Sequence, residues 1–158
     1  MKREYPERPL VGVGAVIVEG DRVVLVRRAA EPMAGEWSIP GGLLELGETM
    51  RAGAEREALE ETGLQVEAGE VLGVLDRILP DASGKLRFHY VLIDFLCRRI
   101  EGELHAGGDA TEARWVREAE LEGLGVAEAA VRIIQQGLDR RATPRVSIPP
   151  SPDSPITR

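Results

Sequence analysis

The feature that most constrains this chain is a short predicted helix that carries three glutamates on one side. Thr49 is suited to cap the N-terminus of a helix and Gly63 to follow its C-terminus, which predicts about 13 helical residues between them. At 100° per residue, Glu60 lies about 60° to one side of Glu57, and Glu61 about 40° to the other. Like charges at these spacings repel, so the arrangement costs stability unless something positive sits among them.

Two interpretations of this acidic arc compete. One is a solvated, glutamate-rich helix face, which is unremarkable in a chain whose net charge is −7. The other is a site for a hard divalent cation, because Mg²⁺ and Mn²⁺ prefer oxygen ligands and Mg²⁺ usually shares the phosphates of a substrate. The residues that precede the helix favour the second interpretation.

The residues before and within the helix form a spaced motif. Gly42 is followed after five residues by Glu48 and, after seven more, by the run Arg56-Glu57-Ala58-Leu59-Glu60-Glu61-Thr62-Gly63-Leu64. This pattern resembles the Nudix box of the MutT/Nudix hydrolase superfamily, and every fixed position of that box matches. Ala58 is smaller than the aliphatic residue usual at its position, a departure that concerns packing and not metal chemistry.

The resemblance implies a metal site built on this helix. It makes Glu57 and Glu61 the main ligands, with Glu60 as a further ligand or as the group that activates water. A backbone carbonyl of Gly41 or Gly42 would complete the set, since glycine lets the chain fold tightly enough to approach a cation. The implied cofactor is Mg²⁺, with Mn²⁺ as a substitute.

The resemblance also gives roles to two further charged residues. Arg56 would support catalysis by pairing with a carboxylate of the box, such as Glu48, and holding the helix against its loop. The alternative for Arg56 is a surface ion pair that contributes little. Glu48 lies outside the helical arc and is either a supporting group or a direct metal ligand.

Weaker signals bear on the substrate. Pro80 lies sixteen residues after Leu64, where ADP-ribose pyrophosphatases of the superfamily carry a marker proline, although it also suits an ordinary turn. Arg27 and Arg28 end a predicted strand that leads to the site, so one of them could bind a phosphate; solvation of the strand end is the alternative. Trp37 could stack on a base or anchor its loop in the core.

A late acidic loop supplies candidates for the catalytic base. Asp109 and Glu112 stand just before a predicted strand, where the family often places a base or an additional ligand. A solvated acidic loop is the alternative. Among Glu60, Asp109 and Glu112 we favour Glu112, because the resemblance to ADP-ribose pyrophosphatases favours the loop, whose acids could close over the bound substrate and exclude water.

The order of the predicted elements indicates an α+β fold, a Nudix-type α/β/α sandwich with a mixed β-sheet. Residues 1–140 form the expected Nudix hydrolase domain, and residues 141–158 a proline-rich tail that is extended because five prolines exclude a helix. Residues 29–48 are expected to form a loop, and residues 126–140 a second helix. Strands are expected at residues 11–18, 22–28, 66–78, 86–99 and 114–116.

Composition excludes several classes of function. The chain of 158 residues suits one domain, and its net charge of −7 argues against binding nucleic-acid backbones. It has no apolar run of about 20 residues and no secretory signal, so we expect no membrane partner and a cytoplasmic location. A single cysteine, Cys97, excludes a disulfide framework. The oligomeric state stays open, with a homodimer among the alternatives.

The combined hypothesis is a Mg²⁺-dependent enzyme that cleaves a nucleoside diphosphate linked to another moiety. The resemblance favours ADP-ribose, converted to AMP and ribose 5-phosphate. Hydrolysis of a nucleoside triphosphate or a dinucleoside polyphosphate is the alternative within the enzyme class. A Nudix-fold module that binds nucleotide without cleaving it is the alternative outside that class, although such a module needs no intact set of hydrolytic carboxylates.

Overall fold

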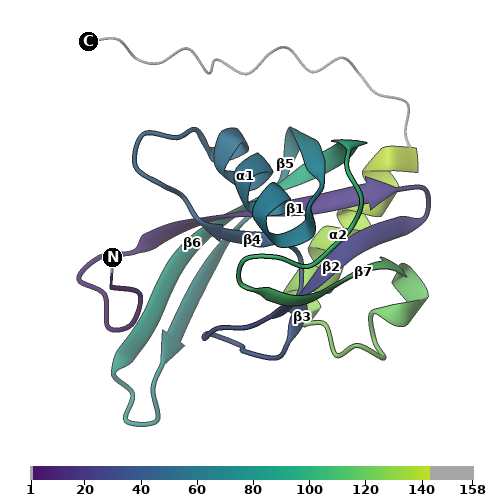
Figure 1. Ribbon diagram of the computed structural model, residues 1–158. Coiled ribbons are helices and arrows are strands. Elements are labelled where there is room, and N and C mark those ends of the chain that lie inside the picture. Colours follow the sequence, from purple (N-terminus) through teal and green to yellow (C-terminus); the bar gives the residue numbers. More distant parts are fainter. Residues whose placement is uncertain (1, 143–158) are drawn as a thin grey trace.

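The computed structural model describes residues 2–142, which form a seven-stranded mixed β-sheet with an α-helix on each face (Figure 1). This arrangement confirms the predicted α/β/α sandwich. The proposed tail lies outside the described residues except at its first two positions, which end the last helix. In chain order the elements are β1 (Leu10–Glu19), β2 (Arg22–Arg28), β3 (Trp37–Ser38), β4 (Gly41–Leu43), α1 (Met50–Thr62), β5 (Gln65–Pro80), β6 (Leu86–Glu101), β7 (Ala110–Arg117), the 3₁₀ turn η1 (Glu118–Glu120) and α2 (Glu128–Ala142).

The sheet is organised around β1. The main strand order is β3-β2-β1-β6-β5, with β4 paired to β1 and β7 paired to β2. β1 runs parallel to β6 and antiparallel to β2 and β4, so the sheet is mixed as predicted. β5 and β6 form a long antiparallel hairpin that projects from the body of the sheet (Figure 1).

Each face of β1 is covered by a different helix. On one face, Ala54 and Ala58 of α1 are fully buried against the odd-numbered residues of β1, such as Val13. On the other face, Ile133 and Ile134 of α2 pack with a cluster that includes Val16. The small Ala58 therefore lets α1 lie close to the sheet, and this close packing brings the carboxylates of α1 to the edge formed by β4.

The segment 29–48 is not entirely a loop, which corrects the prediction. β3 and β4 lie inside it, and they are only two and three residues long. Strands this short carry no hydrophobic periodicity, and glycine is a poor strand former, so pairing with β1 and β2 decides their conformation. β7 is likewise longer than its predicted core of 114–116, because it pairs along β2 from Arg22 to Arg28. In the part of the chain described here, no helix has both the length and the apolar character needed to cross a bilayer.

Candidate active site

Both ends of α1 are capped as the sequence predicted. The Thr49 hydroxyl accepts a hydrogen bond from the backbone N–H of Ala52 at 3.1 Å. At the other end, Gly63 has a φ of 71° and donates its N–H to the Leu59 carbonyl at 3.0 Å. A side chain with a Cβ adopts this left-handed conformation rarely, so glycine ends the helix here. These caps determine which residues of α1 face the β4 edge.

Arg56 is the positive charge among the carboxylates of α1. Its guanidinium donates to Glu48 from Nη2 at 2.6 Å and from Nε at 3.0 Å, and to Glu57 from Nη1 at 2.8 Å. Nη1 also lies 3.4 Å from Glu60, and Nη2 donates to the Leu43 carbonyl at 3.0 Å. The hydrogen bonds to Glu48 raise the pKa of Arg56. Arg56 thus ties the helix to the loop before it, as the resemblance implied.

Glu48 supports Arg56, and both of its carboxylate oxygens already accept hydrogen bonds within the protein. One of its carboxylate oxygens accepts from Nε and the other from Nη2, and the second also accepts the backbone N–H of Glu45 at 2.8 Å. The hydrogen bonds from Arg56 lower the pKa of Glu48. Of the two roles open to Glu48, the geometry favours the supporting role over direct ligation of a metal.

Glu57 and Glu61 form a poorly neutralised pair of carboxylates. Glu61 is only 7% exposed, and its burial, together with the charge of Glu57, raises its pKa to about 8. Burial also raises the pKa of Glu57, against the opposing effect of Arg56. The charge of Asp109 acts on both residues in the same upward direction. A divalent cation bound between them would relieve this repulsion.

The two glycines before the helix leave room for these carboxylates. A Cβ at Gly42 would lie 2.5 Å from the Cδ of Glu57, and a Cβ at Gly41 would lie 2.5 Å from the Val13 carbonyl oxygen. A side chain at Gly41 would push β4 away from β1, and a side chain at Gly42 would displace the Glu57 carboxylate. The close approach of Glu57 to the backbone therefore requires glycine.

The pairing of β4 distinguishes the two glycines. Backbone hydrogen bonds join Ala15 to Pro40 and Leu44 to Val11, and in an antiparallel ladder the bonded residues alternate. Gly42 consequently faces β1, whereas the N–H and C=O of Gly41 point away from β1. The backbone of Gly41 acts on the Glu61 carboxylate and opposes the rise of its pKa. The Gly41 carbonyl points to the same side as its N–H, so it is the glycine carbonyl that can bind a cation.

Glu57, Glu61 and the Gly41 carbonyl fit a divalent cation once the Glu57 side chain turns away from Arg56. Within residues 2–142, no three His, Cys, Asp or Glu side chains are grouped as a ready set of metal ligands. The reason lies in Arg56, which holds Glu57, and in Glu60, whose side chain is 52% exposed. Glu57, Glu61 and the Gly41 carbonyl offer only oxygen donors, the set that Mg²⁺ or Mn²⁺ prefers.

Arg27 and Arg28 point in different directions, because successive residues of a strand do so. Arg28 lines a cavity beside β4 and donates from Nε to the Pro32 carbonyl at 3.0 Å. Arg27 donates to the Gly35 carbonyl at 2.9 Å and pairs with Glu112 at 3.3 Å. Of the two, only Arg28 is placed to bind a phosphate at the carboxylate site.

For two candidate substrate-binding residues the structure favours the alternative role. Trp37 is 8% exposed, packs in the core on the α2 side of the sheet, and has the Arg114 guanidinium 4.8 Å from its ring centroid. Of the two roles open to Trp37, this position favours the loop anchor over stacking on a base. Pro80 ends β5 beside the hairpin turn and is exposed, which fits an ordinary turn proline.

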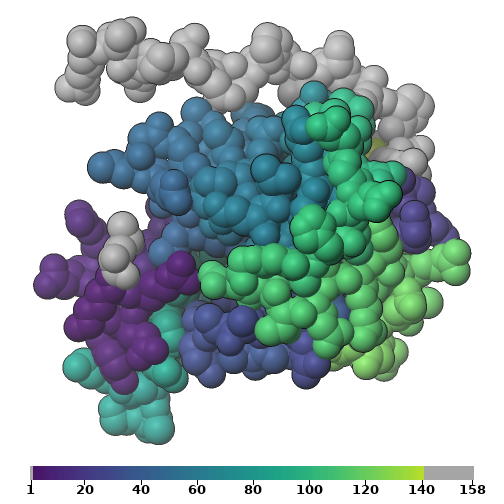
Figure 2. Space-filling view, viewed as in Figure 1, coloured from purple at the N-terminus to yellow at the C-terminus, as the bar shows by residue number. Residues whose placement is uncertain are grey.

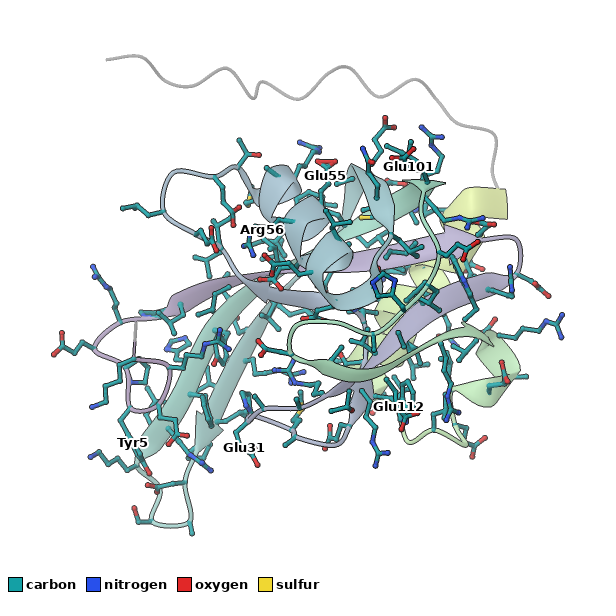
Figure 3. The ribbon with its side chains drawn as sticks, viewed as in Figure 1. Tyr5, Glu31, Glu55, Arg56, Glu101 and Glu112 are labelled. Atoms are coloured by element: carbon teal, nitrogen blue, oxygen red, sulfur yellow. The ribbon has the colours of Figure 1, made fainter. Side chains whose placement is uncertain are left out.

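The preference for Glu112 as the base is also not supported. Glu112 lies opposite Arg27 on β7 and forms ion pairs with Arg27 and Arg114, well away from Arg56 of α1 (Figure 3). Asp109, in the loop before β7, is the late acid whose charge reaches both Glu57 and Glu61. The register of β7 against β2 separates the two acids. Because they are only three residues apart in the sequence, the sequence alone could not show this separation.

A cavity lies beside Gly41 and Gly42, and its lining includes polar residues that no sequence motif had indicated. Its volume is about 810 Å³ including its open mouth, and Gly41, Gly42 and Arg28 are among the residues that line it. Its other walls include Arg3, Ile39, Arg77, Tyr90 and Asp94. Arg3 arrives on the N-terminal segment, which packs against the β5–β6 hairpin through the Tyr5 hydroxyl and Asp81 at 2.8 Å (Figure 2). Asp94 had a sequence signal: it is the charged residue inside the apolar run 90–97.

Comparisons with known proteins agree with this geometry. The chain is 37% identical over 107 residues to the ADP-ribose pyrophosphatase of Methanocaldococcus jannaschii, a match that covers 68% of this chain and 61% of that protein. It is 37% identical over 110 residues to the "Putative 8-oxo-dGTP diphosphatase 2" of Mycobacterium tuberculosis, covering 69% of this chain and 74% of that one.

A solved structure of similar fold is the MutT NUDIX hydrolase from Burkholderia pseudomallei. Its TM-score is 0.68 at 28% identity, with 82% of this chain and 98% of that chain covered. The family model described as "NUDIX domain" matches residues 8–136, which contain the capped helix, the paired glycines and the carboxylates. The chain therefore belongs to the NUDIX family.

Proposed function

We propose that this protein is a Mg²⁺-dependent pyrophosphohydrolase that acts on a nucleoside diphosphate linked to a second moiety, with ADP-ribose as its substrate and AMP and ribose 5-phosphate as products. One observation carries the proposal: Glu57 and Glu61 lie against the backbone of Gly42 and Gly41, and these glycines line a cavity that Arg28 and Arg77 also line. Negative and positive groups side by side suit a cation and a diphosphate together. The similarity to the Methanocaldococcus jannaschii pyrophosphatase supports ADP-ribose.

The residues have separate tasks in this reaction. Glu57, Glu61 and the Gly41 carbonyl would hold Mg²⁺, which when bound offsets the charge of the diphosphate and acidifies water. Arg56 keeps α1 and its glutamates in position, and Arg28 binds a phosphate oxygen. A water attacks one phosphorus, the bond from that phosphorus to the bridging oxygen breaks, and the Asp109 carboxylate accepts the proton of the water.

A second candidate is hydrolysis of a nucleoside triphosphate. The observation that favours it is the 37% identity to the Mycobacterium tuberculosis protein named as an 8-oxo-dGTP diphosphatase. The non-catalytic sensor is disfavoured because Glu57, Glu60 and Glu61 are all present on α1. A cytoplasmic location, the lack of nucleic-acid partners and a homodimer stay predictions.

The test is a substrate panel with chromatographic separation of products. Purified protein is incubated with Mg²⁺ and, separately, ADP-ribose, other nucleoside diphosphate sugars, dinucleoside polyphosphates, dGTP and 8-oxo-dGTP. We expect AMP and ribose 5-phosphate from ADP-ribose at the highest kcat/KM. Faster release of diphosphate from a triphosphate would favour the second candidate, and no turnover of any compound would contradict both. Glu61→Gln serves as the inactive control.

A further inference from the structure

Asp94 is a buried carboxylate that neither the metal site nor the fold accounts for. It lies in the middle of β6, is 6% exposed, and lines the cavity beside Gly41. Its neighbours along the strand, Ile93 and Phe95, are apolar. Burying a carboxylate is expensive unless a partner compensates for it. The question is therefore which group that partner is.

The protein supplies only part of the compensation. Arg77, on β5 and in the same cavity, is the cation whose charge acts on Asp94. Among residues 2–142 no hydrogen bond to the Asp94 carboxylate is present, and no fully enclosed side-chain oxygen in that range lacks a partner. The Asp94 oxygens must then open onto the cavity. They are acceptors aimed at whatever enters it.

The position of this carboxylate relative to the metal site limits what it can meet. Gly41, Gly14 and Asp94 stand in one row across β4, β1 and β6. Gly14 has no side chain, and the Asp94 carboxylate occupies the space that a Cβ at Gly14 would need. Because neighbouring strands are about 5 Å apart, the carboxylate lies roughly one strand spacing from Gly41. A group that it contacts is therefore about one sugar ring away from the place where the Gly41 carbonyl would hold a cation and its bound phosphate.

We propose that Asp94 is a specificity-determining residue that accepts hydrogen bonds from the vicinal hydroxyls of a ribose next to the cleaved diphosphate. An acidic side chain that binds a ribose hydroxyl is an established mode of nucleotide recognition. A 2′-deoxyribose would leave one acceptor of a buried charge unpaired, so the site favours ribose over deoxyribose. The inference rests on the proposed function, and it disfavours deoxynucleoside triphosphates such as 8-oxo-dGTP as substrates.

The test measures binding of the two expected products and their deoxy forms. Calorimetry in the presence of Mg²⁺ compares AMP with 2′-deoxy-AMP, and ribose 5-phosphate with 2-deoxyribose 5-phosphate. In the wild type we expect the ribose form of one pair to bind at least about 10-fold more tightly. The pair that shows the difference identifies which ribose meets Asp94. Asp94→Ala should reduce the preference below about threefold, and Asp94→Asn should reduce it by less, since its amide still accepts one bond.

The matched control is Asp76→Ala, because Asp76 is an exposed aspartate on β5 outside the cavity. It should keep the full preference. Equal affinities within both pairs in the wild type would overturn the proposal, as would a preference that survives in Asp94→Ala. A residue with only a structural role would change melting temperature and leave the ratio between ribose and deoxyribose unchanged. The binding test needs no turnover, so an inactive substrate panel would defeat the proposed function without deciding this inference.

Discussion

The guanidinium of Arg56 donates two hydrogen bonds to the Glu48 carboxylate, at 2.6 and 3.0 Å. The side chains are 23% and 16% exposed, so water screens the pair only partly. A flat guanidinium can offer two parallel donors, whereas an ammonium cannot. The pair connects α1 to the loop that precedes it, and the carboxylates used in the proposed reaction depend on that connection.

Replacing Arg56 with lysine tests the importance of its two parallel hydrogen bonds to Glu48. Arg56→Lys keeps the charge and loses the paired geometry, so we expect the free energy of unfolding to fall by about 1–3 kcal/mol. Denaturant titration measures it. Arg27→Lys is the matched control, because the Arg27–Glu112 pair is exposed on both sides and should contribute little. Equal losses in the two variants would show that the geometry of the Arg56 pair is unimportant.

Removal of the metal should abolish activity, and the carboxylate pair should account for the dependence. Chelation should stop turnover and Mg²⁺ should restore it and raise the melting temperature. Glu61→Gln should lower kcat by at least about 10²-fold and remove the stabilisation by Mg²⁺. Glu55→Gln, on another side of α1, should leave both nearly unchanged. Turnover in excess chelator would exclude the metal mechanism.

The catalytic base is expected to be Asp109. Asp109→Asn should lower kcat by about 10²-fold while Mg²⁺ affinity and KM change little, because a base acts in the transition state. Glu112→Gln should keep its kcat, since Glu112 is paired with Arg27 and Arg114. Steady-state kinetics and Mg²⁺ titrations of both variants and of Glu60→Gln show which of the three carboxylates is the base. A large kcat loss only in Glu60→Gln would move the role to α1.

A methyl group at Gly42 should disturb the metal site without touching a carboxylate. Gly42→Ala places a Cβ 2.5 Å from the Glu57 Cδ, which must then move. We expect the Mg²⁺ affinity to fall by at least about 10-fold, since ligand position controls metal binding. Gly123→Ala is the control, because its nearest contact would be an ordinary 3.7 Å. Wild-type Mg²⁺ affinity in Gly42→Ala would contradict the proposed closeness of Glu57 to β4.

The buried Asp94 should make stability fall as pH rises. Burial, against the opposing charge of Arg77, raises its pKa from 3.8 to about 6 in the folded protein. The folded state then binds this proton more tightly than the unfolded state, so the carboxyl lowers stability between about pH 4 and pH 6. The change is about 3 kcal/mol at 1.36 kcal/mol per pKa unit. Unfolding free energies of wild type and Asp94→Asn should diverge across this range, and parallel curves would contradict the assignment.

Local chemistry explains why much of this site could be predicted from the sequence. Thr49 and Gly63 mark the ends of α1 by their own backbone preferences, and the period of the helix then sets the angles between Glu57, Glu60 and Glu61. The spacing from Gly42 to Leu64 indicated the family. Apolar runs located β1, β2, β5 and β6, and hydrophobic residues of each strand contribute to the core.

Tertiary pairing decided what those local signals left open. Arg27 and Arg28 are equivalent in sequence, and only the register of β2 sends Arg28 into the cavity and Arg27 toward Glu112. The choice between Gly41 and Gly42 follows from the alternation of hydrogen bonds to β1, and that between Asp109 and Glu112 from where β7 begins. Contacts between residues far apart in the chain depend on strand register, which a linear sequence does not display. The sequence determined the fold family and the carboxylate helix, and the assembled sheet determined which residues stand around it.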